Sequence, residues 1–226
     1  SKLSLAFSCV PENDLYSVLA SNGHRFPRFD SPNEALDDVP RGGGLLIMAD
    51  GYPGRTTEVD EEILAGAAQE GVRTYIEYPT SLPGIEVGPP RVAEWERGIV
   101  ASDAFEPFLQ RLAIVDLHGC RFVPMWAEDP LLAMGRVAGL DRAVYGLPRE
   151  CHALLLKHPR CDALIASTKL SHFVTARYSP THAWKSIWRT LLGLLAPGKR
   201  IPQLLWVPTA GPSHSKKERL RGDAER

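Results

Sequence analysis

Polar residues follow apolar runs at several points of the sequence, and three of them belong to types that carry out acid–base chemistry. Asp50, Glu77 and His118 each come directly after such a run. Carboxylates and imidazoles act as acids and bases once burial or neighbouring charges adjust their pKa values. If the runs are parallel strands, their carboxyl ends meet at the edge of the sheet where open α/β folds bind ligands. The pattern therefore predicts Glu77, His118 and Asp50 as a candidate catalytic set.

Six further side chains lie in the turns after the predicted strands or just before the last helix. Aromatic rings stack on flat or ring-shaped ligands, and hydroxyl, ammonium and guanidinium groups hydrogen-bond to polar ones. These residues are therefore predicted to bind a ligand: Tyr52, Tyr78, Ser81, Thr168, Lys169 and Arg177.

The stretch YIEYPTSLPG, residues 75–84, lies where α/β enzymes often carry a nucleophile. An elbow of that kind needs small residues beside the nucleophile, because its backbone is strained and closely packed. If Ser81 were the nucleophile, both small positions would be prolines, which lack an N–H and fix φ. If the elbow lies earlier, its centre is Glu77 or Tyr78. Neither is an acyl-transfer nucleophile, although a glutamate can attack a sugar carbon. Cys9, at the end of the first apolar run, is an alternative nucleophile.

Composition restricts the classes of function. The chain has 226 residues, a formal net charge of −1 and 44% apolar residues, as is typical of a folded domain with a full core. The near-zero charge predicts no nucleic-acid partner, and no apolar stretch reaches the roughly 18 residues of a membrane span. The glycine run 42–44 precedes a strand instead of opening a helix, so neither a phosphate loop nor a cofactor is predicted.

The four cysteines are widely spaced and form no C-x-x-C motif. They are expected to be small buried side chains, with one disulfide left open, and no metal site is predicted from their spacing. Asp50, Glu77, His118 and His172 also lack a metal-ligand spacing.

Strand-like and helix-like segments alternate along the first third of the chain. Crossovers of about a dozen residues between the strands predict parallel βαβ units. Later strand candidates are short and close together, which favours an antiparallel extension of the sheet. The predicted strands are 3–8, 24–29, 45–49, 72–76, 113–117, 121–123, 142–145, 153–156 and 163–167, with 201–207 as a last strand or a linker.

Helix starts and stops support the same order. Residues 12–21 have one apolar face and end at an Asn-Gly stop. Three helix starts are indicated: a proline at the first position after Ser31, a capping box formed by Thr57 and Asp60, and the pair 179–180 before a helix with two core tryptophans.

These strand ends resemble those of the class I glutamine amidotransferase superfamily. LLIMADGYP, residues 45–53, lies where the family has its third strand and the glycine turn that supplies oxyanion amides. VRTYIEYPTS, residues 72–81, lies where the family has its nucleophile strand and elbow. The run 164–195 resembles closing segments of such domains in large carbohydrate-processing proteins. The resemblance covers residues 3–198 and implies an α/β, flavodoxin-like three-layer sandwich, mostly parallel with an antiparallel extension.

The resemblance is to the non-amidotransferase branch, which includes ThuA-like domains and the trimerisation domain of some β-galactosidases. The family's triad needs a histidine with a nearby acid, and no glutamate follows His172 two residues later. His118, with Asp116 close in sequence, is therefore the histidine that we favour.

A full core without a nucleophile triad predicts a degenerate, non-catalytic amidotransferase-like domain spanning residues 1–200. Residues 201–226 are then a linker or tail toward a further domain. The expected partners are other domains of the same polypeptide, further copies in a homo-oligomer, or a carbohydrate ligand. Two alternatives stay open: a hydrolase that uses Glu77 and His118 with Asp50, and a binding protein for a small polar metabolite.

Overall fold

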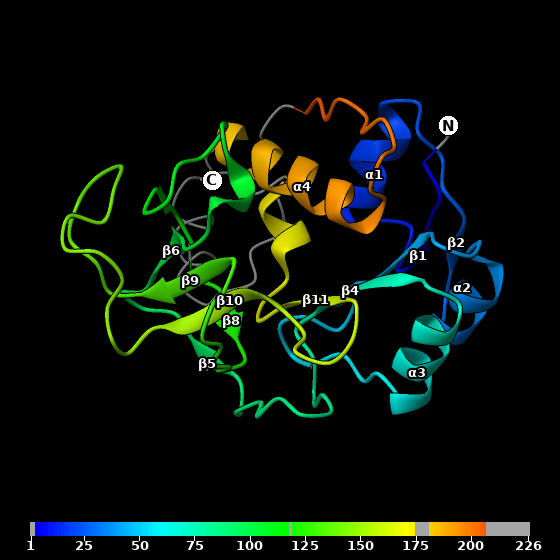
Figure 1. Ribbon diagram of the computed structural model, residues 1–226, viewed down its shortest axis with the longest axis horizontal. Helices are drawn as coiled ribbons and strands as arrows, with labels where there is room; N and C mark the ends of the chain where they lie inside the picture. The colour runs from blue at the N-terminus through cyan, green and yellow to red at the C-terminus, as the bar shows by residue number, and fades with distance from the viewer. Residues whose placement is uncertain (1–2, 118, 175–180, 207–226) are drawn as a thin grey trace, which may run out of the picture.

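The apolar runs of the sequence form one mixed sheet in the computed structural model, which describes residues 3–117, 119–174 and 181–206 (Figure 1). Within those residues the sheet has nine strands in the order β2-β1-β3-β4-β11-β10-β9-β6-β7. Their bounds are β1 Leu5–Ser8, β2 Arg28–Phe29, β3 Gly44–Ile47, β4 Arg73–Glu77, β6 Arg97–Val100, β7 Ile114–Val115, β9 Leu132–Gly135, β10 His152–Lys157 and β11 Ala163–Ala166. Arg91–Val92 (β5) and Arg121–Phe122 (β8) pair separately.

The sheet has a parallel half and an antiparallel half. β2, β1, β3, β4 and β11 run parallel, so the ends of four successive central strands lie at one edge. β10, β9, β6 and β7 continue the sheet with antiparallel pairings. The predicted α/β flavodoxin-like fold, with its antiparallel extension, is confirmed.

Helices cover both faces of the sheet, which gives three layers (Figure 1). Asp14–Ser21 (α1) and Thr181–Leu195 (α4) pack on one face, and Pro32–Asp38 (α2) and Glu61–Gln69 (α3) on the other. Alternate strand residues supply the two cores, as the pleat requires: Leu46 faces α1 and α4, whereas Leu45 faces α2 and α3. Asp103–Phe105 (η1) and Leu170–Val174 (η2) are short 3₁₀ turns.

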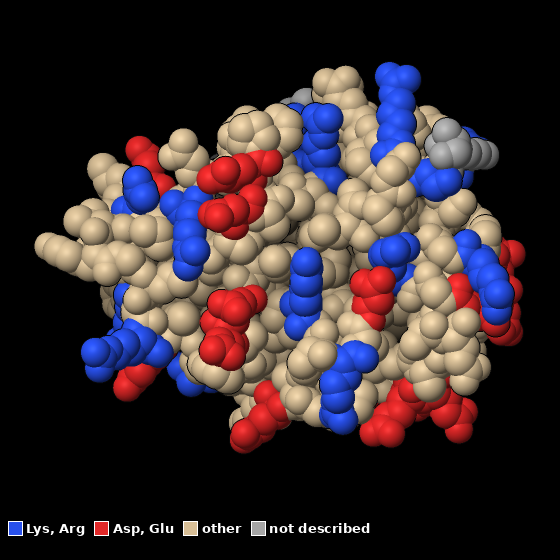
Figure 2. Space-filling view, in the orientation of Figure 1, with Lys and Arg blue, Asp and Glu red and all other residues tan. Residues whose placement is uncertain are grey.

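Both tryptophans of α4 are buried, as predicted. Trp188 packs edge-on against Tyr75 of β4, with ring centroids 5.2 Å apart, and Trp184 stacks on Phe173 at 4.8 Å. None of the helices among the described residues is long and apolar enough to cross a membrane. Charges of both signs are interspersed over the face shown in Figure 2, with no extended patch of one sign.

The predicted helix start at Ser31 is confirmed, because the Ser31 side chain caps α2. The first helix begins two residues later than predicted, at Asp14, with Asn13 as its side-chain cap. The predicted start at 179–180 lies outside the described residues. The predicted capping box of Thr57 and Asp60 is wrong, because Asp60 itself is the N-cap and makes no side-chain cap bond. The backbone of Thr57 instead pairs with the loop after β4, accepting from the Thr80 amide at 2.8 Å.

One predicted strand is absent from the described residues, and three observed strands were not predicted: β5, β6 and β9. Residues 142–145 form no strand, since only an isolated bridge joins Ala113 and Arg142. Residues 201–206 form no strand, which agrees with the linker alternative for that segment. β9 escaped prediction because its four residues, LAMG, are too short to show a period and end in glycine. All four cysteines are free thiols.

Candidate functional site

Glu77 ends β4 and lies at the centre of the carboxyl edge of the parallel strands. Its side chain is 0% exposed. Oε1 accepts hydrogen bonds from the Tyr75 hydroxyl at 3.0 Å and the Ser171 amide at 2.8 Å. Oε2 accepts from the Ala49 amide at 3.2 Å and the Ser171 hydroxyl at 3.0 Å. The carboxyl group is therefore fully engaged inside the protein.

The Glu77 network joins four elements. Asn13, the buried cap of α1, donates from Nδ2 to the Ser171 hydroxyl at 3.2 Å. Through Ser171 and Ala49 the carboxyl group connects α1, η2 and the end of β3 to β4. Burial raises the pKa of Glu77, against the opposing effects of Lys169 and the hydrogen-bond donors. The arrangement is that of a structural centre at the strand ends.

Tyr78 occupies the elbow position directly after β4. Its φ of +52° lies in the left-handed region, which is unusual for a bulky residue. Backbone bonds on both sides hold this conformation: the Tyr78 amide donates to Ala166 O at 2.8 Å, and its carbonyl accepts from the Thr57 amide at 2.7 Å. Strained backbone of this kind clusters at functional sites, and here it carries a phenol.

The rings of Tyr52 and Tyr78 meet edge-on, with centroids 5.1 Å apart, and both are buried. The Tyr78 hydroxyl donates to Pro53 O at 3.3 Å, and the Tyr52 hydroxyl accepts from the Arg121 amide at 2.8 Å. Thr168 Oγ1 donates to Arg121 O at 2.6 Å. Burial raises the pKa values of both phenols, although the Arg121 side chain lowers that of Tyr78. Tyr52, Tyr78 and Thr168 are thus brought together around Arg121.

Asp50 lies at the rim of the same edge. Its Oδ1 accepts from the Val10 amide at 3.1 Å. Desolvation raises the pKa of Asp50, while that amide and Lys169 lower it. Lys169 also lowers the pKa of Glu77, so its charge acts on both carboxyl groups. Ser81 is exposed in the loop beyond the elbow. Two predicted site residues, His118 and Arg177, lie outside the described residues.

His172 also lies at this edge, although the sequence favoured His118 as the functional histidine. Its ring is 5% exposed and lies 6.4 Å from the ring of Tyr52. The acid near it comes from α1, since His172 Nδ1 lies 3.9 Å from Asp14 Oδ2. Asp14 and His172 are far apart in the sequence and come together because α1 packs against η2. The family's pattern of a histidine followed two residues later by a glutamate therefore does not reveal the pair.

Cys9, predicted as an alternative nucleophile, directly follows β1. Burial raises its pKa to about 12, with Asp50 adding to the shift. A thiol with that pKa is protonated at neutral pH and is a poor nucleophile. Among the described residues, no group of three or more His, Cys, Asp or Glu side chains is arranged to hold a metal ion.

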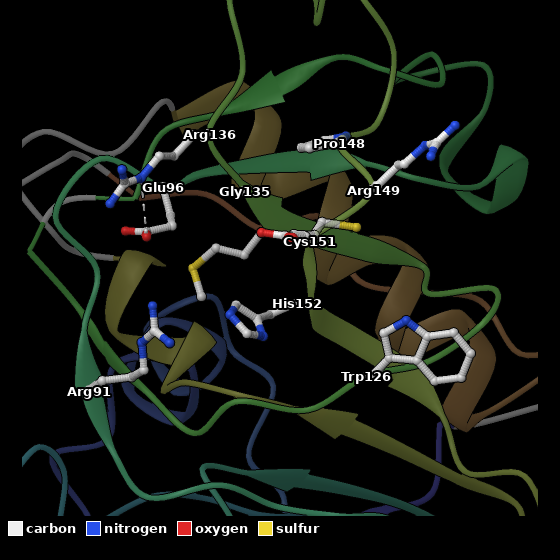
Figure 3. A pocket seen from close by; sticks show the side chains of 11 residues that line it. Arg91, Glu96, Trp126, Gly135, Arg136, Pro148, Arg149, Cys151 and His152 are labelled. Carbon is white, nitrogen blue, oxygen red and sulfur yellow. Dashed lines mark ion pairs between the residues drawn. The ribbon is translucent and has the colours of Figure 1, made fainter.

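Glu77 and the residues around it, Tyr75, Ser171, Asn13 and Cys9, are here called the strand-end cluster. A second candidate region lies away from this cluster, on the antiparallel half of the sheet. It is an open cleft of about 770 Å³ beside β9 and β10 (Figure 3). Figure 3 shows His152 at its centre, with Arg91 and Glu96 on one side and Trp126 on the other. No sequence pattern marks this cleft, because its walls come from separate segments of the chain.

Comparisons with known proteins support the fold. No family model matches the chain, and no curated protein matches its sequence. The structure of PurLQS from Thermotoga maritima is similar with a TM-score of 0.50 and 13% identity, over 86% of this chain and 100% of that chain. A putative GMP synthase subunit from Thermoplasma acidophilum is similar with a TM-score of 0.47 and 13% identity, over 87% of this chain and 96% of that one. The likeness to PurLQS agrees with the mostly parallel, flavodoxin-like α/β fold of this chain.

Proposed function

We propose that this chain is a non-catalytic amidotransferase-like domain of a larger carbohydrate-processing protein, in the branch with ThuA-like and β-galactosidase trimerisation domains. The observation that carries the proposal is the elbow. Its left-handed position holds Tyr78, a buried phenol with a raised pKa, in place of an acyl-transfer nucleophile. The fold is retained while the residue that would attack a substrate is of the wrong chemical type.

The groups around the elbow support the same proposal. Glu77 has no exposed surface and accepts four hydrogen bonds, so a substrate cannot reach it without breaking the buried network. Cys9, with a pKa of about 12, supplies no thiolate at neutral pH. His172 Nδ1 lies 3.9 Å from Asp14 Oδ2, and the elbow residue Tyr78 is not an acyl-transfer nucleophile that such a pair would activate.

An exposed apolar segment supports a role in assembly with another domain or a second copy. Residues 136–151, here called the arm, link β9 to β10 and project from the left of the molecule in Figure 1. Leu140 and Tyr145 are each 88% exposed, and Val144 is 66% exposed. Arg97 anchors the arm by donating to the Gly139 and Leu140 carbonyls at 2.6 and 3.0 Å. A fixed loop that presents apolar side chains to solvent is typical of an interaction surface.

Enzyme assays test the proposal directly. The purified chain should release no ammonia from glutamine and no product from a panel of nitrophenyl glycosides. Its rates should equal those of a Tyr78→Phe variant and of a buffer blank. Turnover that is lost in His118→Ala or Asp50→Asn would establish the hydrolase alternative and refute the non-catalytic proposal.

A separate measurement tests the role in assembly. Sedimentation of the wild-type chain at rising concentration should show self-association, or binding to the neighbouring domain when the two are mixed. The double variant Leu140→Ser/Tyr145→Ser should lose that association. Equal association of the wild type and the variant would show that the arm is not the contact.

A further inference from the structure

We propose that the cleft around Trp126 binds a neutral oligosaccharide, with one sugar ring stacked on the Trp126 indole. The inference deepens the proposed function, on which the carbohydrate context rests, and it names a ligand site apart from the elbow. The site lies on the antiparallel half of the sheet and not at the strand ends.

The shape of the region suits an elongated ligand. A second hollow, of about 740 Å³, adjoins the cleft of about 770 Å³, and both are lined by Trp126 and His152. The two together form a groove, here called the Trp126 groove, and Trp126 and His152 line both of its halves. Each half is within the size range of small-molecule sites, so the whole can take several sugar rings.

Trp126 is an aromatic platform on a fixed backbone. Its side chain is 71% exposed. The preceding residue, Met125, is buried, and its carbonyl accepts from the Ala153 amide of β10 at 2.8 Å. A large indole exposed on a hydrogen-bonded loop is suited to stacking, because little conformational entropy is lost on binding. The C–H face of a pyranose ring is an apolar partner for it.

The charges of the groove suit a ligand that is rich in hydroxyl groups. Hydroxyls donate and accept, so they are satisfied by a mixed lining better than by charges of one sign. Cations and carboxylates are nearly balanced, which disfavours a strongly charged ligand. The lining cations are Arg91, Arg136, Arg149 and Lys157, and the carboxylates are Glu86, Glu96, Glu128, Asp129 and Glu150.

The polar groups near the centre are held in place before any ligand binds. Glu96 accepts from the Glu94 and Trp95 amides at 2.8 and 3.1 Å and pairs with Arg136 at 3.7 Å, as drawn in Figure 3. Burial and the charge of Arg91 lower the pKa of His152, so its ring is neutral at pH 7 and offers one donor and one acceptor.

One glycine shapes the wall of the groove. A Cβ at Gly135 of β9 would lie 2.9 Å from Pro148 Cγ and 3.3 Å from Cys151 Cβ. Glycine therefore allows the arm to return close to the floor of the cleft. The segment that carries Arg149 and Cys151 thereby lines the same cleft as Trp126.

Calorimetric titration with defined tetrasaccharides tests the proposal. The probes are cellotetraose, maltotetraose, xylotetraose and chitotetraose, each added to the whole chain. At least one should bind, and Trp126→Ala should weaken that binding about tenfold or more. Trp95→Ala is the matched control, because Trp95 is also 71% exposed but is not among the residues that line either hollow. It should leave the affinity unchanged.

Three outcomes would overturn the inference. They are no binding of any of the four probes by folded protein, an equal loss in both tryptophan variants, and binding of a sugar phosphate or nucleotide without any neutral tetrasaccharide. The products are also analysed after long incubation. Cleavage of a bound probe would refute the non-catalytic proposal but would still support oligosaccharide binding in the groove. If no probe is bound and none is cleaved, only the proposal of oligosaccharide binding is refuted.

Discussion

The strand-end cluster and the Trp126 groove are built on the same sheet but treat their polar groups in opposite ways. At the strand ends, Glu77 satisfies four donors and shows no surface to solvent. In the groove, charged side chains line open space around an indole that is 71% exposed. A buried polar group that is fully bonded stabilises a fold, whereas polar groups held open are available to a ligand.

This contrast shows that a polar residue can lie where the fold usually binds ligands and still be inaccessible to a ligand. Sheet topology favours the carboxyl ends of the parallel strands as the ligand site. Among the described residues, Glu77, Ser171 and Asn13 form a buried hydrogen-bonded network at that edge, whereas an open cleft lies on the antiparallel extension.

The largest expected contrast is in thiol reactivity. Cys9 belongs to the closed cluster and Cys151 to the open groove. Burial raises the pKa of Cys9 from 9.0 to about 12, which lowers its thiolate fraction by about a thousandfold, and its side chain is also inaccessible. At pH 8, Ellman's reagent should modify Cys151 quickly and Cys9 at least about a thousandfold more slowly, as followed by peptide mass spectrometry.

Unfolding in denaturant supplies the control, since all four cysteines should then react at similar rates. Labelling of native Cys151 should also block tetrasaccharide binding, because it lines the groove. Fast modification of native Cys9 would mean that the strand-end cluster is open, and the comparison would fail.

The next largest effect is on stability, through Glu77→Gln. Each carboxyl oxygen of Glu77 accepts one backbone N–H, from Ser171 or from Ala49. A glutamine must point its NH₂ group at one of these amides, which leaves a buried donor facing a donor. The free energy of unfolding should fall by about 3 kcal/mol in a denaturant titration. Glu62→Gln, on the exposed face of α3, should leave stability unchanged.

Much of the fold could be predicted from the sequence because its signals are local. The strands that became β1, β3, β4 and β11 are short apolar runs with turns after them, and their alternation with helices specifies a parallel sheet. The errors also have local causes. Residues 142–145 have a strand-like composition but lie in the arm, where Val144 and Tyr145 are exposed. β9 is too short to show a period.

The candidate sites were harder to predict, because they depend on contacts between distant residues. The sequence correctly located Glu77 at a strand end, but it could not show that Ser171 and Ala49 would enclose it. Asp14 approaches His172 only after α1 and η2 pack together. The groove forms from β5, β9, β10, the arm and several loops, so no short motif marks it.

The pH dependence of stability gives a smaller effect from the same carboxyl group. Because burial raises the folded-state pKa of Glu77 above its ordinary 4.5, the folded state binds the proton more tightly than the unfolded state. This contribution is fully present below about pH 4.5 and is lost as the pH rises through the raised folded-state value. The stability gap between wild type and Glu77→Gln should therefore narrow as the pH rises above about 4.5. A gap that widens with pH would mean that the ionised form is the stabilised one.

The smallest effect is expected from Tyr75→Phe, which removes one oxygen from the closed cluster. Glu77 Oε1 loses the donor at 3.0 Å but keeps the Ser171 amide, and the ring keeps its contact with Trp188. The free energy of unfolding should fall by about 1 kcal/mol, the usual net value of one buried hydrogen bond. Trp126→Ala removes a whole indole from the open groove, yet it should change stability by less than about 0.5 kcal/mol, because that side chain is already in solvent. If the two variants are ordered the other way in the same denaturant titration, Trp126 packs within the fold, and its exposure cannot be attributed to ligand binding.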